Sequence, residues 1–348
     1  MLLSHSPVAA PAAENTPKAI RIWLLSLAVL VVLILSVGGA TRLTGSGLSI
    51  TEWQPIVGTL PPLTEADWQE VFAKYRQIPQ YERINRGMDL QAFKVIFWWE
   101  WAHRLLGRLI AVVLLAPLAY FLVTRQLTAG LLLRLAAVLL LGALQGAVGW
   151  YMVHSGLSGR VDVSPYRLAL HLGLAMAIFG ALMTLALAPD APPRPERTKR
   201  GVGSAALIVA LVLLQIVLGA FVAGLKAGLS HNTWPLMDGR LVPVGLGVMQ
   251  PWYLNVFENA MTVQFDHRLV AYLLLLAALA HAWWVRRSAA RVKRSALALA
   301  AAVLAQAGLG IWTLLEHVPL PLALAHQAAA AGVFALALWH LHVLRQLG

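Results

Sequence analysis

Eight apolar stretches, each long enough to cross a bilayer, constrain the fold of this chain more than any other feature of its sequence. A membrane-spanning helix needs about 20 mostly apolar residues to cross the hydrocarbon core. Hydrophobic residues make up 59% of the chain and charged residues only 12%, so few charges interrupt these stretches. The predicted spans are 20–38, 97–123, 129–152, 166–187, 202–223, 262–284, 296–315 and 320–343. This composition excludes a soluble enzyme, a disordered chain and a typical nucleic-acid-binding protein.

The formal net charge of +12 is distributed unevenly along the chain. If the N-terminus is cytoplasmic, the inside segments hold 14 basic and three acidic residues, and the outside segments hold the other 13 and 12. The surplus is then +11 inside and +1 outside, as the positive-inside rule expects. The charge therefore predicts a multi-pass protein surrounded by membrane lipid, with both termini cytoplasmic and with no nucleic-acid partner.

An internal repeat divides the eight spans into two halves of four. Gly38 and Trp53 recur as Gly219 and Trp234, both at the same offset along the chain. The other matches are His103-Arg104-Leu105 with His267-Arg268-Leu269, Gln145 and Gly149 with Gln306 and Gly310, and His171 with His326. Each half has an even number of spans, so both halves insert with the same orientation. The predicted fold is an all-α membrane protein with two parallel-repeat four-helix bundles, related by a pseudo-twofold axis along the membrane normal.

The repeat also sets the predicted domain boundaries. A cytoplasmic tail (1–19) precedes an N-terminal four-helix half (20–190). A cytoplasmic linker (191–201) leads to a C-terminal four-helix half (202–348). Two long outer loops, 39–98 and 225–261, are rich in Gly, Pro and Trp and are expected on the opposite side.

Four histidines, one pair in each half, are candidate heme ligands. His103 and His171 in the first half, and His267 and His326 in the second, each lie within a turn or two of the outer end of a predicted span. Ionisable residues at membrane depth are costly and usually functional, and neutral imidazole in a bundle core is a common ligand of heme iron. The alternative is a set of interfacial histidines bonded to carbonyls or water. Zinc is disfavoured because no compact Cys/His cluster exists, and copper usually recruits Met or Cys.

Two arginines and six further histidines complete the set of candidate polar groups. Arg104 and Arg268 directly follow a ligand histidine and suit heme propionates, although a long side chain reaching the lipid headgroups is an equal alternative. The remaining histidines are interpreted as solvated or interfacial: His154, His231 and His317 outside, and His281, His340 and His342 inside.

The repeat breaks at one position that bears on chemistry. Glu100 lies three residues before His103, whereas Gln264 lies three residues before His267. Residues i and i+3 share a helix face, so the carboxylate can project toward the same space as the ligand. A buried carboxylate can accept a proton or stabilise developing positive charge, which an amide does not do. This asymmetry predicts a reacting N-terminal half, and the alternative is a glutamate that only caps the start of its helix.

Two stretches of the first half resemble the heme A synthase family. They are Gly38-Gly39-Ala40-Thr41-Arg42-Leu43-Thr44-Gly45-Ser46-Gly47-Leu48-Ser49 with Glu52-Trp53, and Trp98-Trp99-Glu100-Trp101-Ala102-His103-Arg104-Leu105-Leu106-Gly107-Arg108. The resemblance implies an inner-membrane oxidoreductase that oxidises a ring methyl group of heme O to a formyl group, giving heme A for respiratory terminal oxidases. It further implies that His103 and His171 hold the substrate heme O, with Glu100 as the catalytic carboxylate.

The same resemblance implies a heme b cofactor between His267 and His326. It is compatible with heme O synthase as a partner and with a homo-oligomer. Some members carry a cysteine pair in the first outer loop, but this chain has no cysteine and is similar to the cysteine-free bacterial branch. The alternatives are a di-heme cytochrome b-type electron carrier, which predicts two similar sites, and a transporter, which the single depth of the histidines disfavours.

Overall fold

A computed structural model describes residues 17–187 and 201–347 of the chain. Within these residues the regular structure is helical: α1 (Lys18–Leu43), α2 (Glu65–Tyr75), α3 (Pro79–Arg83), α4 (Leu90–Val123), α5 (Ala129–His154), α6 (Pro165–Ala186), α7 (Val202–Gly224), α8 (Asn255–Glu258), α9 (Ala260–Trp284), α10 (Ala290–Leu315) and α11 (Leu320–Leu347). Short 3₁₀ turns lie at Val57–Thr59, Ala227–Leu229 and Trp252–Leu254. Nearly all of the predicted tail (1–19) and linker (191–201) lies outside the described residues.

Eight of these helices are long and apolar enough to cross a membrane, as the sequence predicts. They are α1, α4, α5, α6, α7, α9, α10 and α11. Several extend beyond their apolar stretches: α4 begins at Leu90 instead of 97, and α10 begins at Ala290 instead of 296. Polar caps explain some of the starts, because Asp89 accepts a hydrogen bond from the Ala92 amide and Thr128 accepts one from the Leu131 amide.

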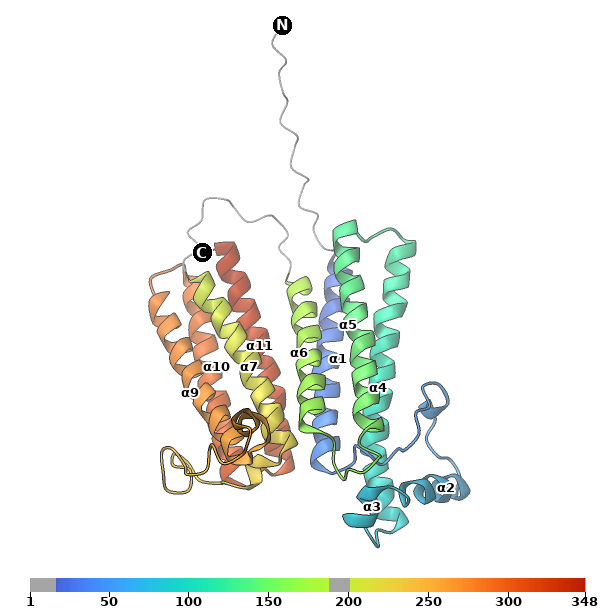
Figure 1. Ribbon diagram of the computed structural model, residues 1–348. Helices are drawn as coiled ribbons and strands as arrows, with labels where there is room; N and C mark the ends of the chain where they lie inside the picture. The colour runs from blue at the N-terminus through green and yellow to red at the C-terminus, as the bar shows by residue number, and fades with distance from the viewer. Residues whose placement is uncertain (1–16, 188–200, 348) are drawn as a thin grey trace.

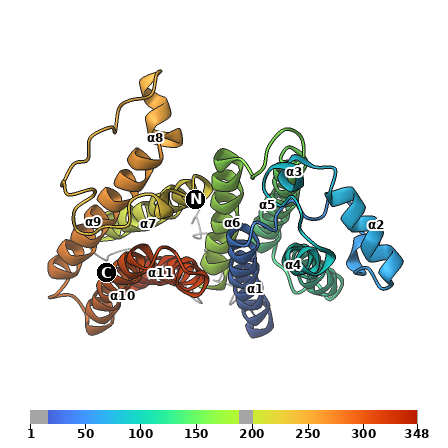
Figure 2. The same cartoon turned by 90° about the horizontal axis from the view of Figure 1, so that it is seen from below.

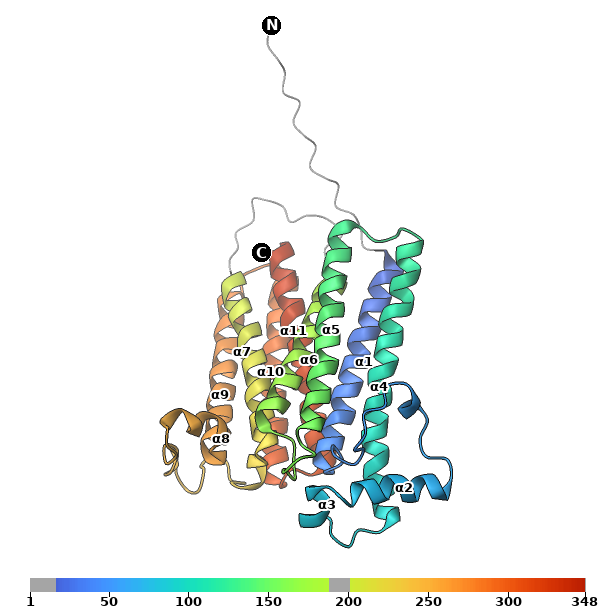
Figure 3. The ribbon, with the colours of Figure 1, turned by 45° about the vertical axis from the view of Figure 1, so that its right-hand side comes forward.

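The long helices stand side by side and roughly parallel in two neighbouring sets (Figures 1 and 3). In the first set α1 packs against α4 and α6, and α5 packs against α6. In the second set α7 packs against α9 and α11, and α10 packs against the same two helices. The sets meet where α6 packs against α7 and α1 packs against α11. Seen end-on, α1, α6, α7 and α11 occupy the middle of the molecule (Figure 2).

The two ends of the helices differ in what they carry. Helix α1 begins, and helix α11 ends, on one side, which we call the terminal side (Figure 1). Residues 44–89 and 225–259 cover the opposite side, which we call the loop side (Figure 1). The first of these loops holds α2 and α3, and its aromatic residues form a small core of their own against the start of α4, which includes Trp68, Tyr75 and Phe93. This segment is therefore folded, and it fixes the chain next to the loop-side end of α4.

Helix α2 begins with a reciprocal cap. The Asp67 amide donates to Thr64 Oγ1 at 3.2 Å, and the Thr64 amide donates to Asp67 Oδ2 at 2.9 Å. The hydrogen bonds from Thr64 and Leu63 hold the pKa of the Asp67 carboxyl below its usual value. The cap thus favours the ionised form of Asp67 at the N-terminus of α2.

Candidate functional site

Each of the four candidate histidines packs its imidazole against a glycine of a neighbouring helix. The contacts are His103 with Gly38 of α1, His171 with Gly149 of α5, His267 with Gly219 of α7, and His326 with Gly310 of α10. A Cβ atom at these glycines would lie 2.7, 3.0, 3.2 and 2.7 Å from the Cε1 atom of the respective ring. The absence of a side chain is therefore what lets the ring lie directly on the neighbouring backbone.

Glutamines orient three of the four imidazoles, and each lies one helical turn before the corresponding glycine. Gln145 Nε2 lies 3.3 Å from His171 Nε2, and Gln306 Nε2 lies 3.2 Å from His326 Nδ1. Gln215 Nε2 lies 3.1 Å from His267 Nδ1 and also donates to the His267 carbonyl oxygen. The residue equivalent to Gln215 in the first half is Ile34, which has no side-chain donor. Polar support of the ring therefore differs at His103.

The two histidines of each half lie within electrostatic range of each other: His103 with His171, and His267 with His326. Three of them lie within two turns of the start of their helix, close to the predicted depth. His103 differs, because α4 begins at Leu90, more than three helical turns before it. The prediction that each histidine lies within a turn or two of its helix end is therefore wrong for His103. The additional turns of α4 extend past its apolar stretch and pack against α2.

The bundle interior is loosely filled at the level of the histidines. In the C-terminal set no residue is buried in segments 213–219, 265–273, 304–312 and 320–330, and the same holds for 101–113, 139–154 and 170–175 of the N-terminal set. Buried side chains resume toward the terminal side, for example at Ala331 and Phe334 of α11. The level therefore fits a group inserted between the helices.

Several buried polar atoms at this level have no hydrogen-bond partner among the described residues. They include His103 Nδ1, His171 Nδ1, and the Oε1 atoms of Gln145, Gln215 and Gln306. Buried polar atoms without partners are uncommon in folded proteins and call for an explanation such as a missing ligand. Together with the glycine contacts and the paired imidazoles, they fit a bis-histidine heme in each half.

Glu100 lies 2% exposed, and it is the only buried carboxylate among the described residues. Its Oε2 atom accepts from Ser49 Oγ and from the Ile50 amide, both at 2.8 Å. Its Oε1 atom accepts from Arg104 Nη2 at 2.6 Å and from Arg104 Nε at 3.1 Å. None of these hydrogen bonds goes to His103. The carboxylate thus joins the loop after α1 to α4 in a nearly closed polar cluster.

The equivalent position in the second half carries an amide, Gln264, and the arginine beside it, Arg268, makes different hydrogen bonds from Arg104. Gln264 Nε2 donates to the Ala227 carbonyl at 2.9 Å, and Gln264 Oε1 accepts from Arg268 Nη2 at 3.1 Å. Arg268 Nη2 also donates to the His231 carbonyl, as Arg104 Nη2 does to the Ile50 carbonyl. However, the buried Nε and Nη1 atoms of Arg268 have no partner among the described residues. Arg268 therefore keeps two N–H donors free for an anion, whereas all three guanidinium nitrogens of Arg104 are engaged.

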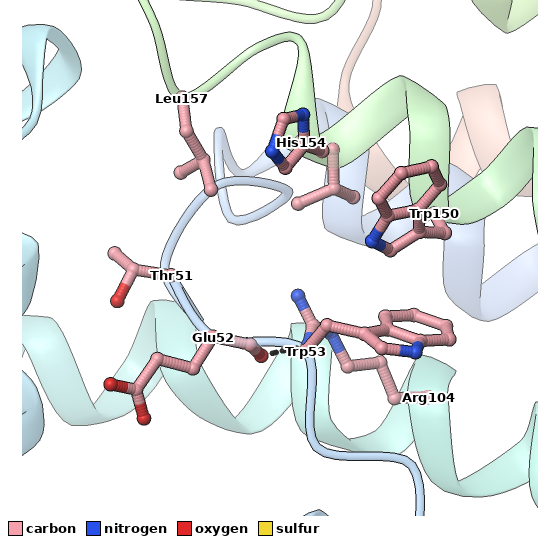
Figure 4. Close-up of a pocket in the computed structure, with 8 residues that line it drawn as sticks. Thr51, Glu52, Trp53, Arg104, Trp150, His154 and Leu157 are labelled. Atoms are coloured by element: carbon pink, nitrogen blue, oxygen red, sulfur yellow. Dashed lines mark hydrogen bonds between the residues drawn. The ribbon is translucent and has the colours of Figure 1, made fainter.

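A small cavity of about 40 Å³ opens at the loop side between the loop at 51–53, Arg104 of α4, and Trp150 and His154 of α5 (Figure 4). This volume suits one or a few water molecules and is far too small for a tetrapyrrole. The Arg104 guanidinium lies 5.8 Å from the Trp53 ring centroid beside it. The cavity therefore belongs to the support of the Glu100–Arg104 pair and is not the heme level.

Two histidines interpreted as interfacial are buried, so that prediction is wrong for them. His281 and His340 are 2% and 0% exposed, and their Nε2 atoms lie 2.7 Å apart. Their place toward the inner side of the predicted spans had indicated solvated or interfacial side chains. His154 and His317 are exposed, as expected.

The fold and these paired imidazoles define a multi-span helical membrane protein with two candidate heme sites, one in each half. The sequence matches the family described as Cytochrome oxidase assembly protein (COX15-CtaA) over residues 21–338, so the chain belongs to that family. A relative from Parvibaculum lavamentivorans, named Heme A synthase, is 54% identical over 93% of this chain and 94% of its own length. Relatives of the same name from Azorhizobium caulinodans (54% identity, 95% of each chain) and Rhodospirillum centenum (50% identity, 99% and 93%) match similarly.

Proposed function

We propose that this chain oxidises a ring methyl group of heme O to a formyl group and so makes heme A for respiratory terminal oxidases. The observation that carries this proposal is one difference between the two histidine sites: among the described residues, only the first has a buried carboxylate, Glu100, close in sequence to its candidate ligand. A di-heme electron carrier has no need of this difference. The names of the relatives agree with the proposal.

In the N-terminal half, His103 and His171 would hold the substrate heme O, and Glu100 would be the catalytic carboxylate. Methyl oxidation removes electrons and protons from one carbon and adds an oxygen atom, so a fixed anion near that carbon stabilises the positive charge that develops there. Four hydrogen bonds hold the two carboxylate oxygens of Glu100 in one fixed position. The Arg104 pair keeps this carboxylate from turning toward solvent.

In the C-terminal half, His267 and His326 would hold a heme b cofactor. When bound, heme b supplies a one-electron carrier whose potential depends on its axial ligands and their surroundings. The unpartnered Nε and Nη1 of Arg268 suit a propionate, because each can donate a charge-assisted hydrogen bond to a carboxylate oxygen. Arg104 is already paired with Glu100, so heme O would be held without that anchor. This contrast suits a resident cofactor in one half and an exchangeable substrate in the other.

The two halves would be related by a pseudo-twofold axis along the membrane normal. Residues at equivalent positions touch each other, as they must near such an axis. Arg42 Nη1 donates to the carbonyl of Ala223, which is its equivalent in the register that relates Gly38 to Gly219. The rings of Phe179 and Phe334, which are equivalent in the register of His171 and His326, lie 6.3 Å apart.

The protein would lie in the bacterial inner membrane with its terminal side in the cytoplasm, next to heme O synthase as the source of substrate. The basic residues gathered at that side support this orientation. The apolar tail of heme O favours entry sideways from the lipid, since each buried methylene contributes about 0.8 kcal/mol. The few contacts between α4 and α5 agree with such a route.

The direct test is expression in a host that makes heme O but no heme A, followed by extraction and mass analysis of the hemes. The proposal predicts a formyl-bearing heme that is absent from cells with empty vector. Heme O and heme B alone, with the chain present in the membrane, would reject it. Replacement of Glu100 by Gln in the same host should leave heme O bound and unconverted, and full conversion would remove Glu100 from the chemistry.

A further inference from the structure

A second histidine pair lies in the C-terminal set, on the terminal side of the candidate heme level. His281 of α9 and His340 of α11 approach each other across the bundle, with Nε2 atoms 2.7 Å apart. Both side chains are buried, at 2% and 0% exposure. Ionisable groups in such a position are costly, so an arrangement that keeps two of them in contact calls for a physical reason.

A serine holds the outer nitrogen of each ring. Ser204 Oγ of α7 lies 2.8 Å from His281 Nδ1, and Ser295 Oγ of α10 lies 2.8 Å from His340 Nδ1. Each hydroxyl is also placed to donate to a carbonyl of its own chain segment. Ser204 Oγ lies 3.1 Å from the Gly201 oxygen, and Ser295 Oγ lies 3.0 Å from the Val292 oxygen. The four side chains thus form one continuous chain that involves all four helices of the set.

When both rings are neutral, the four side chains supply fewer hydrogen atoms than their five contacts need. Five contacts need one hydrogen each: two serine–carbonyl, two serine–imidazole and one imidazole–imidazole. Two hydroxyls and two neutral imidazoles supply one hydrogen each, which makes four. One contact is then left without a hydrogen. With one added proton, both Nδ1–H groups donate to serine, both hydroxyls donate to carbonyls, and one Nε2–H donates to the other Nε2.

We propose that Ser204, His281, His340 and Ser295 form a proton-binding site that takes up one proton, shared between the two facing Nε2 atoms. The proposal rests on hydrogen-bond geometry and is independent of the function proposed above. The added proton satisfies every contact of the chain, and charge-assisted hydrogen bonds are the stronger kind.

A metal or a second heme fits this place poorly. His281 and His340 lie equally far along the chain past His267 and His326, just under four helical turns in each case, and so on nearly the same helix face. The spacing therefore resembles a second ligand level. However, nitrogen ligands lie about 2 Å from a metal, which separates two of them by roughly 3.3 Å on a tetrahedral ion and roughly 4 Å across a heme iron, and the 2.7 Å between these nitrogen atoms is too short for either. The surrounding side chains Ala205, Ile208 and Leu299 are also fully packed, at 1–2% exposure.

The electrostatic surroundings of the histidine pair favour an added proton that stays on these four hydrogen-bonded side chains. Among the described residues, the only charge interaction of His340 is with His281, and His281 has none with a carboxylate or basic side chain. The nearby basic groups Arg21, Arg291 and Arg345 act on His342 instead. Ser204 is partly exposed in the first turn of α7, whereas Ser295 is 1% exposed. A proton therefore enters from the terminal side by way of Ser204, and Ser295 is the closed end.

The site belongs to the second half alone. The positions equivalent to Ser204, Ser295, His281 and His340 hold Trp23, Arg134, Pro117 and Leu185. These residues cannot build the same chain. Leu185 stands at the position equivalent to His340, so leucine is a natural apolar replacement for that ring.

The experiment is a pH titration of the full chain, labelled with ¹⁵N-histidine, in lipid nanodiscs. We expect one transition shared by His281 and His340, together with a strongly downfield N–H–N proton signal. His281→Gln and His340→Gln should each remove the whole transition and the signal, because the proton needs both rings. His342→Gln, outside the four-residue chain, should keep both.

The variant with both His281 and His340 replaced by leucine guards against misfolding of the single variants. Removing both partners leaves no unpaired buried nitrogen, so its thermal midpoint should exceed that of either single variant. Its pH-jump proton uptake should be one proton per chain lower than that of the unchanged protein. Equal uptake, two independent histidine transitions, or loss of one bound heme or metal ion in the single variants would overturn the proposal.

Discussion

Replacement of Gly310 by alanine tests whether the bare glycine backbone is what seats a ligand imidazole. The new Cβ would lie 2.7 Å from His326 Cε1, whereas ordinary van der Waals contact begins at 3.4 Å. The ring must therefore retreat until it regains that separation. Helices α10 and α11 pack along their length, so the backbone is poorly placed to absorb the shift.

The expected magnitude follows from two opposing effects. Alanine favours a helix over glycine by about 1 kcal/mol, whereas overpacking costs about 1–3 kcal/mol. The net destabilisation should therefore be about 0–2 kcal/mol, and the main effect should fall on the ligand. Loss of support for a ligating histidine typically weakens metal binding about 10–100-fold. We expect the Gly310→Ala chain to fold and to lose most of its heme b on purification.

The assay is heme content per chain, measured by pigment extraction, together with a thermal midpoint. Gly308→Ala is the matched control, because Gly308 lies on the same helix and a Cβ there would have no neighbour within 4 Å. It should keep its heme and gain stability. Gly219→Ala should lose less heme than Gly310→Ala, since its Cβ would lie 3.2 Å from His267 Cε1. Full heme content and an unchanged spectrum in Gly310→Ala would refute the reasoning.

Three further outcomes are expected. Arg268→Ala should lower heme b content, because the propionate loses its two donors, while heme O binding in the other half persists; equal loss of both hemes would contradict this assignment. Arg104→Ala should destabilise the protein by about 3–5 kcal/mol in a thermal or denaturant titration, since it leaves the buried Glu100 charge without its partner; a change below about 1 kcal/mol would show that the pair is not needed. Asp67→Asn should weaken protection of α2 amides from hydrogen exchange above pH 3.8, and the difference from the unchanged protein should vanish as the pH falls through the lowered pKa of Asp67; a difference that grows on acidification would contradict the cap.

The sequence predicts the eight spans well because they depend on a local pattern. Apolar runs of helical length locate spans regardless of tertiary packing. The matches of Gln145 with Gln306 and of Gly149 with Gly310 were visible in the repeat, and each pair has the spacing of one helical turn. What they contact was not visible, because the neighbouring histidines lie on other helices. Gln215 was missed since its equivalent is Ile34 and no match marks it.

Two features depend on tertiary structure and could not be predicted locally. Glu100 was expected to face the same space as His103, yet its hydrogen bonds go to Arg104 and to Ser49 and Ile50 of the loop. A helix position defines a face but not which of two neighbours on that face a side chain selects. His281 and His340 lie toward the inner side of their predicted spans, and this place alone suggests solvated or interfacial side chains. Only the packing of α7 and α10 around them shows that they are buried.

The central claim is that the two halves share one histidine design and hold different hemes. It is tested most directly by extracting the hemes from chains purified out of a host that makes both heme O and heme B. Replacement of both His267 and His326 by alanine should remove heme b and leave heme O or heme A bound. Replacement of both His103 and His171 should remove heme O and heme A and leave heme b. Loss of the same heme in both variants, or no loss in either, would contradict the account.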